Sequence, residues 1–275
     1  MYDKGFLLFD ASPFLYIGYN ASLYMLKSET HPFFLEKTKQ IIQSKVMQCL
    51  DYAEMQCNEI LPVFCYDGFP QWKQELQKGT YKENRSPLSS KYKSILKAEM
   101  KKYPGLHFYN KDEEADDLIC TVKQKLIKKF GITKESNVRF YIFTRDNDLL
   151  QLCDSKTVLY DPAKDVGLKD ERYLEQKFGI SNFKKLVLYK ICFGDPSDNI
   201  VGIFKGKRRK PILEMINSVK NYSEFYSNEL VLPQVDEAKR LEKVIHLKKD
   251  CELSTKIFND FNSSDIFGER KWMNF

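Results

Sequence analysis

The sequence predicts an α/β fold in which helices flank a central parallel sheet. Short apolar runs at 5–10, 61–68 and 138–144 have the length of buried strands, and an aspartate stands at or near the end of each. Stretches with helical spacing of apolar residues separate these runs, and such alternation is typical of a parallel sheet. At 275 residues the chain is long enough to bury a sizeable core.

The remaining elements follow from the spacing of apolar residues. Between 112 and 129 apolar side chains recur every three or four positions, which predicts a helix with an acidic first turn. The predicted order is a strand at 5–10, a helix through 35–53, a strand at 61–68, helices near 88–102 and 112–129, strands at 138–144 and 156–160, and mainly helices to about 250, the last at 235–249. We expect two additions to the sheet, a lysine-rich insertion at 71–111 and a helical region after about 181.

Composition excludes several classes of protein. No run of 18 or more apolar residues is present and no secretory signal is visible, so we expect no membrane span and a cytoplasmic location. Seven cysteines without a CxxC pair argue against a disulfide framework or a zinc site, and we expect free thiols. The nucleotide-binding patterns GxGxxG and GxxxxGK[ST] are also absent.

The net charge of +6 is concentrated in two basic zones. Between 71 and 111, ten Lys or Arg residues stand against three Glu, and five more cations lie between Lys205 and Lys210. The rest of the chain is therefore acidic. Two basic zones on an acidic remainder predict a polyanionic partner held at defined places, although a solvated lysine-rich face would also explain either zone taken alone.

Carboxylates gather where the predicted strands end. Asp10, Asp67 and Asp146 occupy such positions, and in a parallel sheet these positions meet at one edge. Each acid alone has an ordinary explanation, because Asp10 can cap the following helix and Asp67 can belong to a turn. Acids in the first turn of a helix are likewise favoured by the helix dipole. So many acids on one edge would repel one another, however, so together they predict bound cations.

The acids come without neighbouring histidine or cysteine, which predicts Mg²⁺, with Mn²⁺ able to replace it. A cluster of this size can hold two ions about 4 Å apart, the arrangement that activates water in phosphodiester cleavage. The basic zones would then hold nucleic-acid backbone around the metal centre.

Six short motifs occur in an order that resembles the structure-specific 5′-nucleases. They are LFDAS at 8–12, YDG at 66–68, YKENR at 81–85, EADDLI at 114–119, TRDNDLLQL at 144–152 and GDPSDNI at 194–200. This family includes flap endonucleases, the 5′-nuclease domain of bacterial DNA polymerase I and bacteriophage 5′-exonuclease/RNase H enzymes. The resemblance covers about residues 5–220 and is nearest in style to the phage RNase H-like branch.

The resemblance implies a PIN-like nuclease domain at 1–180 and a helical duplex-binding domain at 181–275. The insertion at 71–111 would form a helical arch over a single-stranded 5′ end, and about 190–220 would form a helix-three-turn-helix. It implies a Mg²⁺-dependent 5′-3′ exonuclease and flap endonuclease that acts on 5′ flaps, nicks and overhangs of DNA and removes RNA primers from RNA–DNA hybrids in replication and repair. A monomer is implied, in the host cytoplasm if the protein is phage-encoded, with a single-stranded-DNA-binding protein or a sliding clamp as partner.

The resemblance also assigns roles to individual residues. The family's metal-binding acids fall on Asp10, Asp67, Glu114, Asp116, Asp117, Asp146, Asp148, Asp195 and Asp198. The first four of these would hold one ion and the last four a second, with Asp117 between or behind them. Lys82 and Arg85 match the basic pair that contacts the scissile phosphate. The DNA contacts are assigned to Lys73, Tyr81, Lys205, Lys207, Arg208, Arg209 and Lys210.

The chain departs from the family pattern after Asp198. Family members commonly have GVxGIGxKTA, with glycines that often support bound K⁺, whereas cations occupy this turn here and put K⁺ coordination in doubt. Two alternatives stay open: a catalytically silent DNA-binding protein on the same scaffold, and a PIN-like single-strand ribonuclease. The end of the chain, with Phe267, Trp272 and Phe275, is either a docking tail for a replication partner or a packed helix end.

Overall fold

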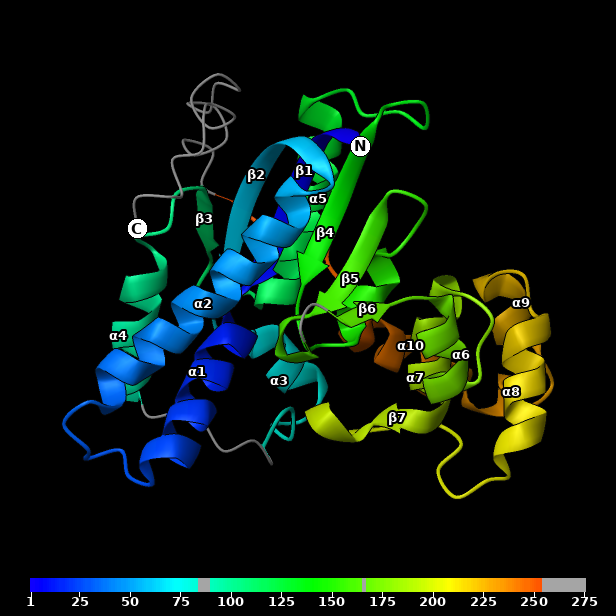
Figure 1. The fold of residues 1–275 in the computed structure, drawn as a ribbon. Helices are drawn as coiled ribbons and strands as arrows, with labels where there is room; N and C mark the ends of the chain where they lie inside the picture. The colour runs from blue at the N-terminus through cyan, green and yellow to red at the C-terminus, as the bar shows by residue number, and fades with distance from the viewer. Residues whose placement is uncertain (84–89, 165–166, 254–275) are drawn as a thin grey trace.

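The computed structural model describes residues 1–83, 90–164 and 167–253. Its centre is a six-stranded sheet in the order β3-β2-β1-β4-β5-β6, in which every neighbouring pair except the last runs parallel (Figure 1). The strands are β1 (Tyr2–Asp10), β2 (Cys57–Tyr66), β3 (Leu106–Tyr109), β4 (Val138–Phe143), β5 (Thr157–Asp161) and β6 (Gly167–Lys169). The predicted α/β class is confirmed, and the antiparallel edge strand β6 is an addition to it.

Alternate residues of β1 enter two different cores. Leu7 and Phe9 pack on the face covered by α1 (Ala11–Leu26) and α2 (Phe34–Glu54). Phe6 and Leu8 pack on the opposite face, which α5 (Ala115–Lys129) covers. Because side chains along a strand alternate between faces, a strand covered on both sides must be apolar throughout. This explains the continuous apolar run near the start of the sequence.

The lysine-rich region contains two helices and a strand. α3 (Gln71–Leu76) follows β2, α4 (Ser90–Met100) packs against α1, and β3 then returns to the sheet edge beside β2. The predicted insertion at 71–111 is therefore too long, because Leu106 and Phe108 are buried in β3. Four residues with two buried positions give too short an alternation to reveal a strand. Arg85 lies outside the described residues.

The chain is mainly helical after the sheet, as predicted. These helices are α6 (Glu171–Phe178), α7 (Leu186–Phe193), α8 (Arg209–Ser218), α9 (Tyr222–Ser227) and α10 (Val235–Ile245). Between α7 and α8 a short hairpin forms from β7 (Gly194–Asp195) and β8 (Ile200–Val201). Gly194 has a φ of +81°, and a Cβ atom there would lie 2.3 Å from the backbone oxygen of Ile200, so the hairpin requires glycine at this position.

The last described segment differs from the prediction. The helix expected at 235–249 ends at Ile245, and residues 246–253 then run without helical structure along α5. All seven cysteines fall in the described part of the chain, and each is free and buried. Among the described residues, no helix is long and apolar enough to cross a membrane. The aromatic residues of the expected tail lie beyond them.

Candidate metal centre

Acidic side chains line a cleft at the carboxyl ends of the strands, near the point where the strand order reverses. The chain leaves β1 for β2 on one side and later returns to β4 on the other, so the switch point of the sheet lies between β1 and β4. Asp10 ends β1, Asp67 follows β2 and Asp146 follows β4. All three line one cleft of about 980 Å³. The convergence expected from the strand ends is therefore present.

Asp10 and Asp67 act as helix caps and also face the cleft. Asp10 Oδ1 accepts a hydrogen bond from the backbone N–H of Ser12 at 3.3 Å, which caps α1. Asp67 Oδ1 accepts one from the backbone N–H of Ala115 at 2.9 Å, at the start of α5. The Ser12 hydroxyl donates to the other oxygen of Asp67. The capping explanation for Asp10 therefore holds together with its cleft location, and Asp67, expected in a turn, contacts the start of α5 and faces the same cleft.

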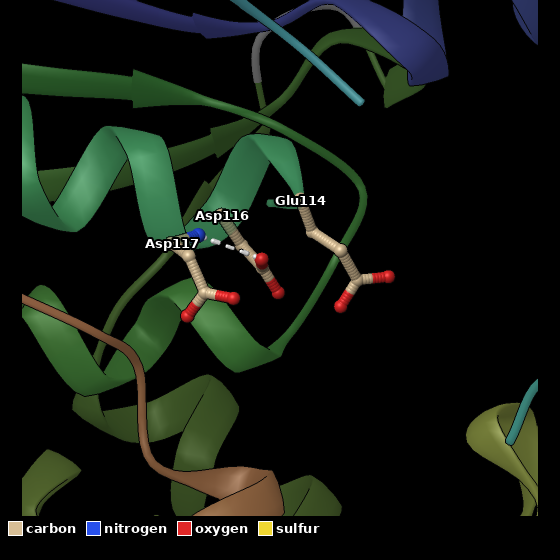
Figure 2. Close-up of side chains that lie close together, drawn as sticks. All are labelled: Glu114, Asp116 and Asp117. Carbon is tan, nitrogen blue, oxygen red and sulfur yellow. Dashed lines mark hydrogen bonds between the residues drawn. The ribbon is translucent and has the colours of Figure 1, made fainter. Parts of the chain in front are cut away.

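Glu114, Asp116 and Asp117 form the first acid cluster, at the start of α5 (Figure 2). One carboxylate oxygen of each lies within 4.8 Å of the others, and all three residues are buried. The backbone N–H of Asp117 donates to Asp116 Oδ1 at 2.7 Å. Figure 2 shows the three side chains leaving the same end of the helix. This end carries the positive pole of the helix dipole, which stabilises their charge.

Two lysines neutralise part of the first acid cluster. Lys73 Nζ lies 2.7 Å from Glu114 Oε2 and 2.8 Å from Asp117 Oδ2, and Lys73 is only 2% exposed. Lys82 Nζ lies 2.5 Å from Glu114 Oε1. This placement differs from the expectation that Lys73 contacts DNA. A buried ammonium between two carboxylates cannot reach a backbone phosphate without leaving both partners, so we correct its role to that of a counter-charge.

Asp148, Asp195 and Asp198 form the second acid cluster, again with carboxylate oxygens within 4.8 Å of one another. Tyr81 and Lys82 join it to the first. The Tyr81 hydroxyl lies 2.8 Å from Glu114 Oε2 and 3.1 Å from Asp198 Oδ2, so it can donate to either cluster. Lys82 Nζ lies 3.6 Å from Asp198 Oδ2. Tyr81 is buried, so its ring is not presented to DNA as expected, and its hydroxyl instead links the acids.

Lys190 is a site residue that the sequence reasoning missed. Its ammonium pairs with both Asp148 and Asp195, and all three residues are buried. Asp195 also accepts a hydrogen bond from the backbone N–H of Ser197 at 2.9 Å. A signal was present in the sequence, since Lys190 interrupts the otherwise apolar LVLYKICF of α7. A charged residue in such a helix needs a buried partner, and Asp195 follows five positions later.

A tight turn after β4 fixes Asp146 and Asp148. Thr144 Oγ1 accepts from the backbone N–H of Asp146 at 2.9 Å and donates to Asp10 Oδ2 at 2.8 Å. Asp146 Oδ1 in turn accepts from the backbone N–H of Asp148 at 2.9 Å. The threonine therefore ties the end of β4 to the end of β1, and with them the aspartates that each strand presents to the cleft.

The chain's own cations compensate the buried acids only in part. Burial raises the pKa of Asp10 and of Asp116 well above the usual range for aspartate. Burial also disfavours the charged form of Glu114, but Lys73 and Lys82 outweigh it and lower its pKa to about 2. The carboxylates that remain under-compensated offer oxygen donors alone, which suit a hard divalent cation. The residues present therefore fit a divalent metal ion of this kind.

The basic segment Lys205–Lys210 is exposed and follows β8. Its last two residues, Arg209 and Lys210, begin α8. Arg209 is partly structural, since its guanidinium lies 2.6 Å from the Tyr189 hydroxyl and stacks over the rings of Tyr189 and Phe193, each at 5.2 Å. These contacts hold α8 against α7. The other residues expected to contact DNA here, all exposed, are Lys205, Lys207, Arg208 and Lys210.

Comparison with known proteins gives consistent matches. The family model described as 5′-3′ exonuclease, N-terminal resolvase-like domain, matches residues 5–179. The 5′-3′ exonuclease of Mycoplasma pneumoniae is 25% identical over 92% of this chain and 89% of its own length. That of Mycoplasmopsis pulmonis is 27% identical over 68% of this chain, which spans only 62% of that relative. Flap endonuclease Xni of Shewanella pealeana is 27% identical over 64% of this chain and 70% of its own length.

Solved structures share the fold at low sequence identity. The T5 D15 protein co-crystallised with metal ions has a TM-score of 0.61 and 16% identity over 89% of both chains. T5 5′-exonuclease with bound zinc has a TM-score of 0.63 and 15% identity over 88% of this chain and 89% of that chain. These matches confirm the predicted PIN-like sheet flanked by helices.

Proposed function

The chain belongs to the family of 5′-3′ exonucleases with an N-terminal resolvase-like domain, nucleases that hydrolyse phosphodiester bonds, and we propose that it cuts DNA at 5′ ends and flaps with bound Mg²⁺. The observation that carries this proposal is the pair of buried acid clusters at the switch point of the sheet, with Lys82 between them. The names of the relatives support cleavage at 5′ ends and flaps. The T5 D15 protein, described with metal ions, supports metal dependence.

Each acid cluster would bind one metal ion together with aspartates from the ends of the strands. Asp10, Asp67, Glu114 and Asp116 would hold the first ion, and Asp146, Asp148, Asp195 and Asp198 the second. When bound, divalent ions lower the pKa of water and stabilise negative charge on a leaving oxygen. The chain's contribution is to hold the carboxylates in place through the caps of α1 and α5 and the Thr144 turn. Oxygen donors alone favour Mg²⁺, with Mn²⁺ as a substitute.

Lys82 is the chain's own group for the reacting phosphate. Its ammonium lies between Glu114 and Asp198, and its side chain is 19% exposed, so it borders both clusters and the cleft. A phosphodiester gains negative charge on its non-bridging oxygens during attack, and a fixed ammonium donating to those oxygens stabilises that charge. Arg85, which follows in the YKENR motif, is proposed for the same phosphate.

DNA would be gripped beside the metal centre by the exposed basic segment. Lys205, Lys207, Arg208 and Lys210 follow the hairpin that carries Asp195 and Asp198, so a duplex held there is in register with the site of cutting. Contacts of this kind neutralise phosphates without reading sequence. We extend the proposal to RNA primers in RNA–DNA hybrids, and to a nuclease domain at 1–180 with a duplex-binding region after it.

A labelled flap substrate tests the proposed function. Products from a 5′-labelled flap are mapped with Mg²⁺, with Mn²⁺ and with EDTA, beside an RNA–DNA hybrid and a free RNA strand. We expect metal-dependent cuts near the flap junction and at the 5′ end, leaving 5′-phosphates, with the free RNA strand uncut. Asp146→Asn and Asp195→Asn should abolish cleavage while DNA binding persists, whereas the exposed Asp112→Asn should cut normally. Cleavage undiminished in EDTA would overturn the proposal.

A further inference from the structure

Residues 246–253, here named the C-terminal strap, run from α10 along α5. The backbone N–H of Lys248 donates to Asp117 Oδ1 at 2.8 Å. One turn further along α5, the Thr121 hydroxyl donates to the backbone oxygen of Lys248 at 3.3 Å and accepts from the backbone N–H of Cys251 at 3.2 Å. Asp117 and Thr121 are four positions apart, so they share one face of the helix. The strap is therefore fastened to α5 by two fully buried side chains.

Both carboxylate oxygens of Asp117 are occupied by the protein itself. Oδ1 receives the Lys248 N–H, Oδ2 lies 2.8 Å from Lys73 Nζ, and the residue is 0% exposed. Asp117 was expected between or behind the other metal-binding acids, and its contacts make it the anchor of the strap.

The Lys248 side chain makes a second attachment at the start of α5. Its ammonium lies 2.8 Å from Glu113 Oε1 and 4.0 Å from the centre of the Trp72 ring. The Trp72 indole N–H donates to the other oxygen of Glu113 at 3.3 Å. The strap thus holds Glu113 on one side and Asp117 on the other, and the proposed metal ligands Glu114 and Asp116 lie between them in the sequence.

We propose that the C-terminal strap positions the first acid cluster and sets how tightly that cluster binds a divalent cation. This inference rests on the proposed metal binding at the cluster. Residues that contact a metal ligand, rather than the ion itself, orient that ligand, and their removal typically lowers metal affinity about 10- to 100-fold. Lys248 and Thr121 are positioning residues, because they act through Asp117 and Glu113 rather than on the ion or the substrate.

Metal binding without DNA tests the proposal in the full-length chain. Calorimetric titration with Mn²⁺ is compared for the wild type, Lys248→Ala, Thr121→Val and the double variant. Asp116→Asn identifies the binding step that belongs to the first cluster. Lys249→Ala is the matched control, because Lys249 is the exposed neighbour of Lys248. We expect the double variant to lose about tenfold or more in affinity at the first cluster only, and the control to bind like the wild type.

Trp72 reports on the strap independently of metal. The chain has two tryptophans, so Trp272→Phe leaves Trp72 as the single tryptophan fluorophore. In that background Lys248→Ala should shift the emission of Trp72 without loss of helical circular dichroism. Wild-type affinity at both sites in a folded double variant would overturn the inference and leave the proposed function standing. A wild-type protein that binds no Mn²⁺ would overturn both. If the double variant fails to fold, the single Lys248→Ala decides, since it removes side-chain contacts alone.

Discussion

Lys73 and Glu114 form a buried ion pair at the start of α5, with Nζ 2.7 Å from Oε2. Removing one partner of such a pair leaves the other charge buried and uncompensated, at about 3–5 kcal/mol. Lys73→Met should therefore lower the free energy of unfolding by that amount in EDTA, and Mg²⁺ should restore part of it by replacing the lost positive charge. Thermal unfolding with and without Mg²⁺ measures both. Lys78→Met, at an exposed position five residues later, is the control, and equal stability of the two variants would contradict the pairing.

Asp116 makes the metal-free protein sensitive to pH. Its pKa is raised in the folded state by burial, so the folded chain holds the proton more tightly than the unfolded chain, whose aspartates titrate near about 3.9. The stability that this proton provides is present at low pH and is lost as the pH rises through the raised pKa. In EDTA we therefore expect the free energy of unfolding to fall from about pH 4 toward neutrality.

Asp116→Asn isolates this effect. The amide oxygen can still accept the Asp117 N–H, so the substitution removes the charge and keeps the local hydrogen bond. The variant should be more stable than the wild type at pH 7 in EDTA and inactive with Mg²⁺. Glu114 does not mask the trend. Its pKa is lowered from 4.5 to about 2, so its protonation reduces the stability of the protein only as the pH falls below 4.5. A variant less stable than the wild type at pH 7 would contradict the assignment.

The sequence predicted the acids of the site better than their partners. Asp10, Asp67 and Asp146 could be placed because the carboxyl ends of parallel strands all lie along the same side of the sheet. Lys73 could not, since a lysine in a basic stretch has the same local pattern whether it faces DNA or turns inward. Lys190 was missed for a related reason: its partners lie on other elements, and only the fold brings Asp148 to it.

The irregular parts of the fold were the least predictable. β3 has four residues, too few for a period to be recognised, and the C-terminal strap has no period at all. The strap is held to Asp117 and Thr121 by its backbone N–H and carbonyl groups, which are not specific to any side chain, so its only side-chain signal is the single residue Lys248. A further signal lies in α5, where the polar residues Asp117 and Thr121 stand one turn apart on a buried face.

The basic segment should control the salt dependence of DNA binding. Each lysine or arginine that neutralises a phosphate contributes about 0.9 to the slope of log affinity against log salt concentration. Replacing Lys205, Lys207 and Arg208 together by alanine should flatten this slope by up to about three such contributions, measured on a nicked duplex in an Asp146→Asn background that leaves the DNA intact. Lys220→Ala, exposed beyond α8, is the control. An unchanged slope would place the duplex elsewhere.

Lys82 should act on the chemical step rather than on binding. Its ammonium borders both acid clusters. Its backbone N–H donates to the backbone carbonyl oxygen of Asp198 at 3.1 Å, and its backbone is left-handed, with φ of +55°. Lys82→Met removes the charge, and the left-handed backbone conformation strains methionine no differently from lysine. We expect the single-turnover rate to fall about 100- to 1,000-fold, as when a group that stabilises transition-state charge is lost, while Kd for the flap substrate changes little.

Two comparisons separate catalysis by Lys82 from a structural role. Lys78→Met is a matched control, because Lys78 is also left-handed, with φ of +52°, but exposed. Lys82→Arg should recover part of the rate, since a guanidinium can also donate to a phosphate. If Lys82→Met instead weakened binding as much as it slowed cutting, the ammonium would hold substrate equally in the ground state and the transition state, and its assignment to the reacting phosphate would be wrong.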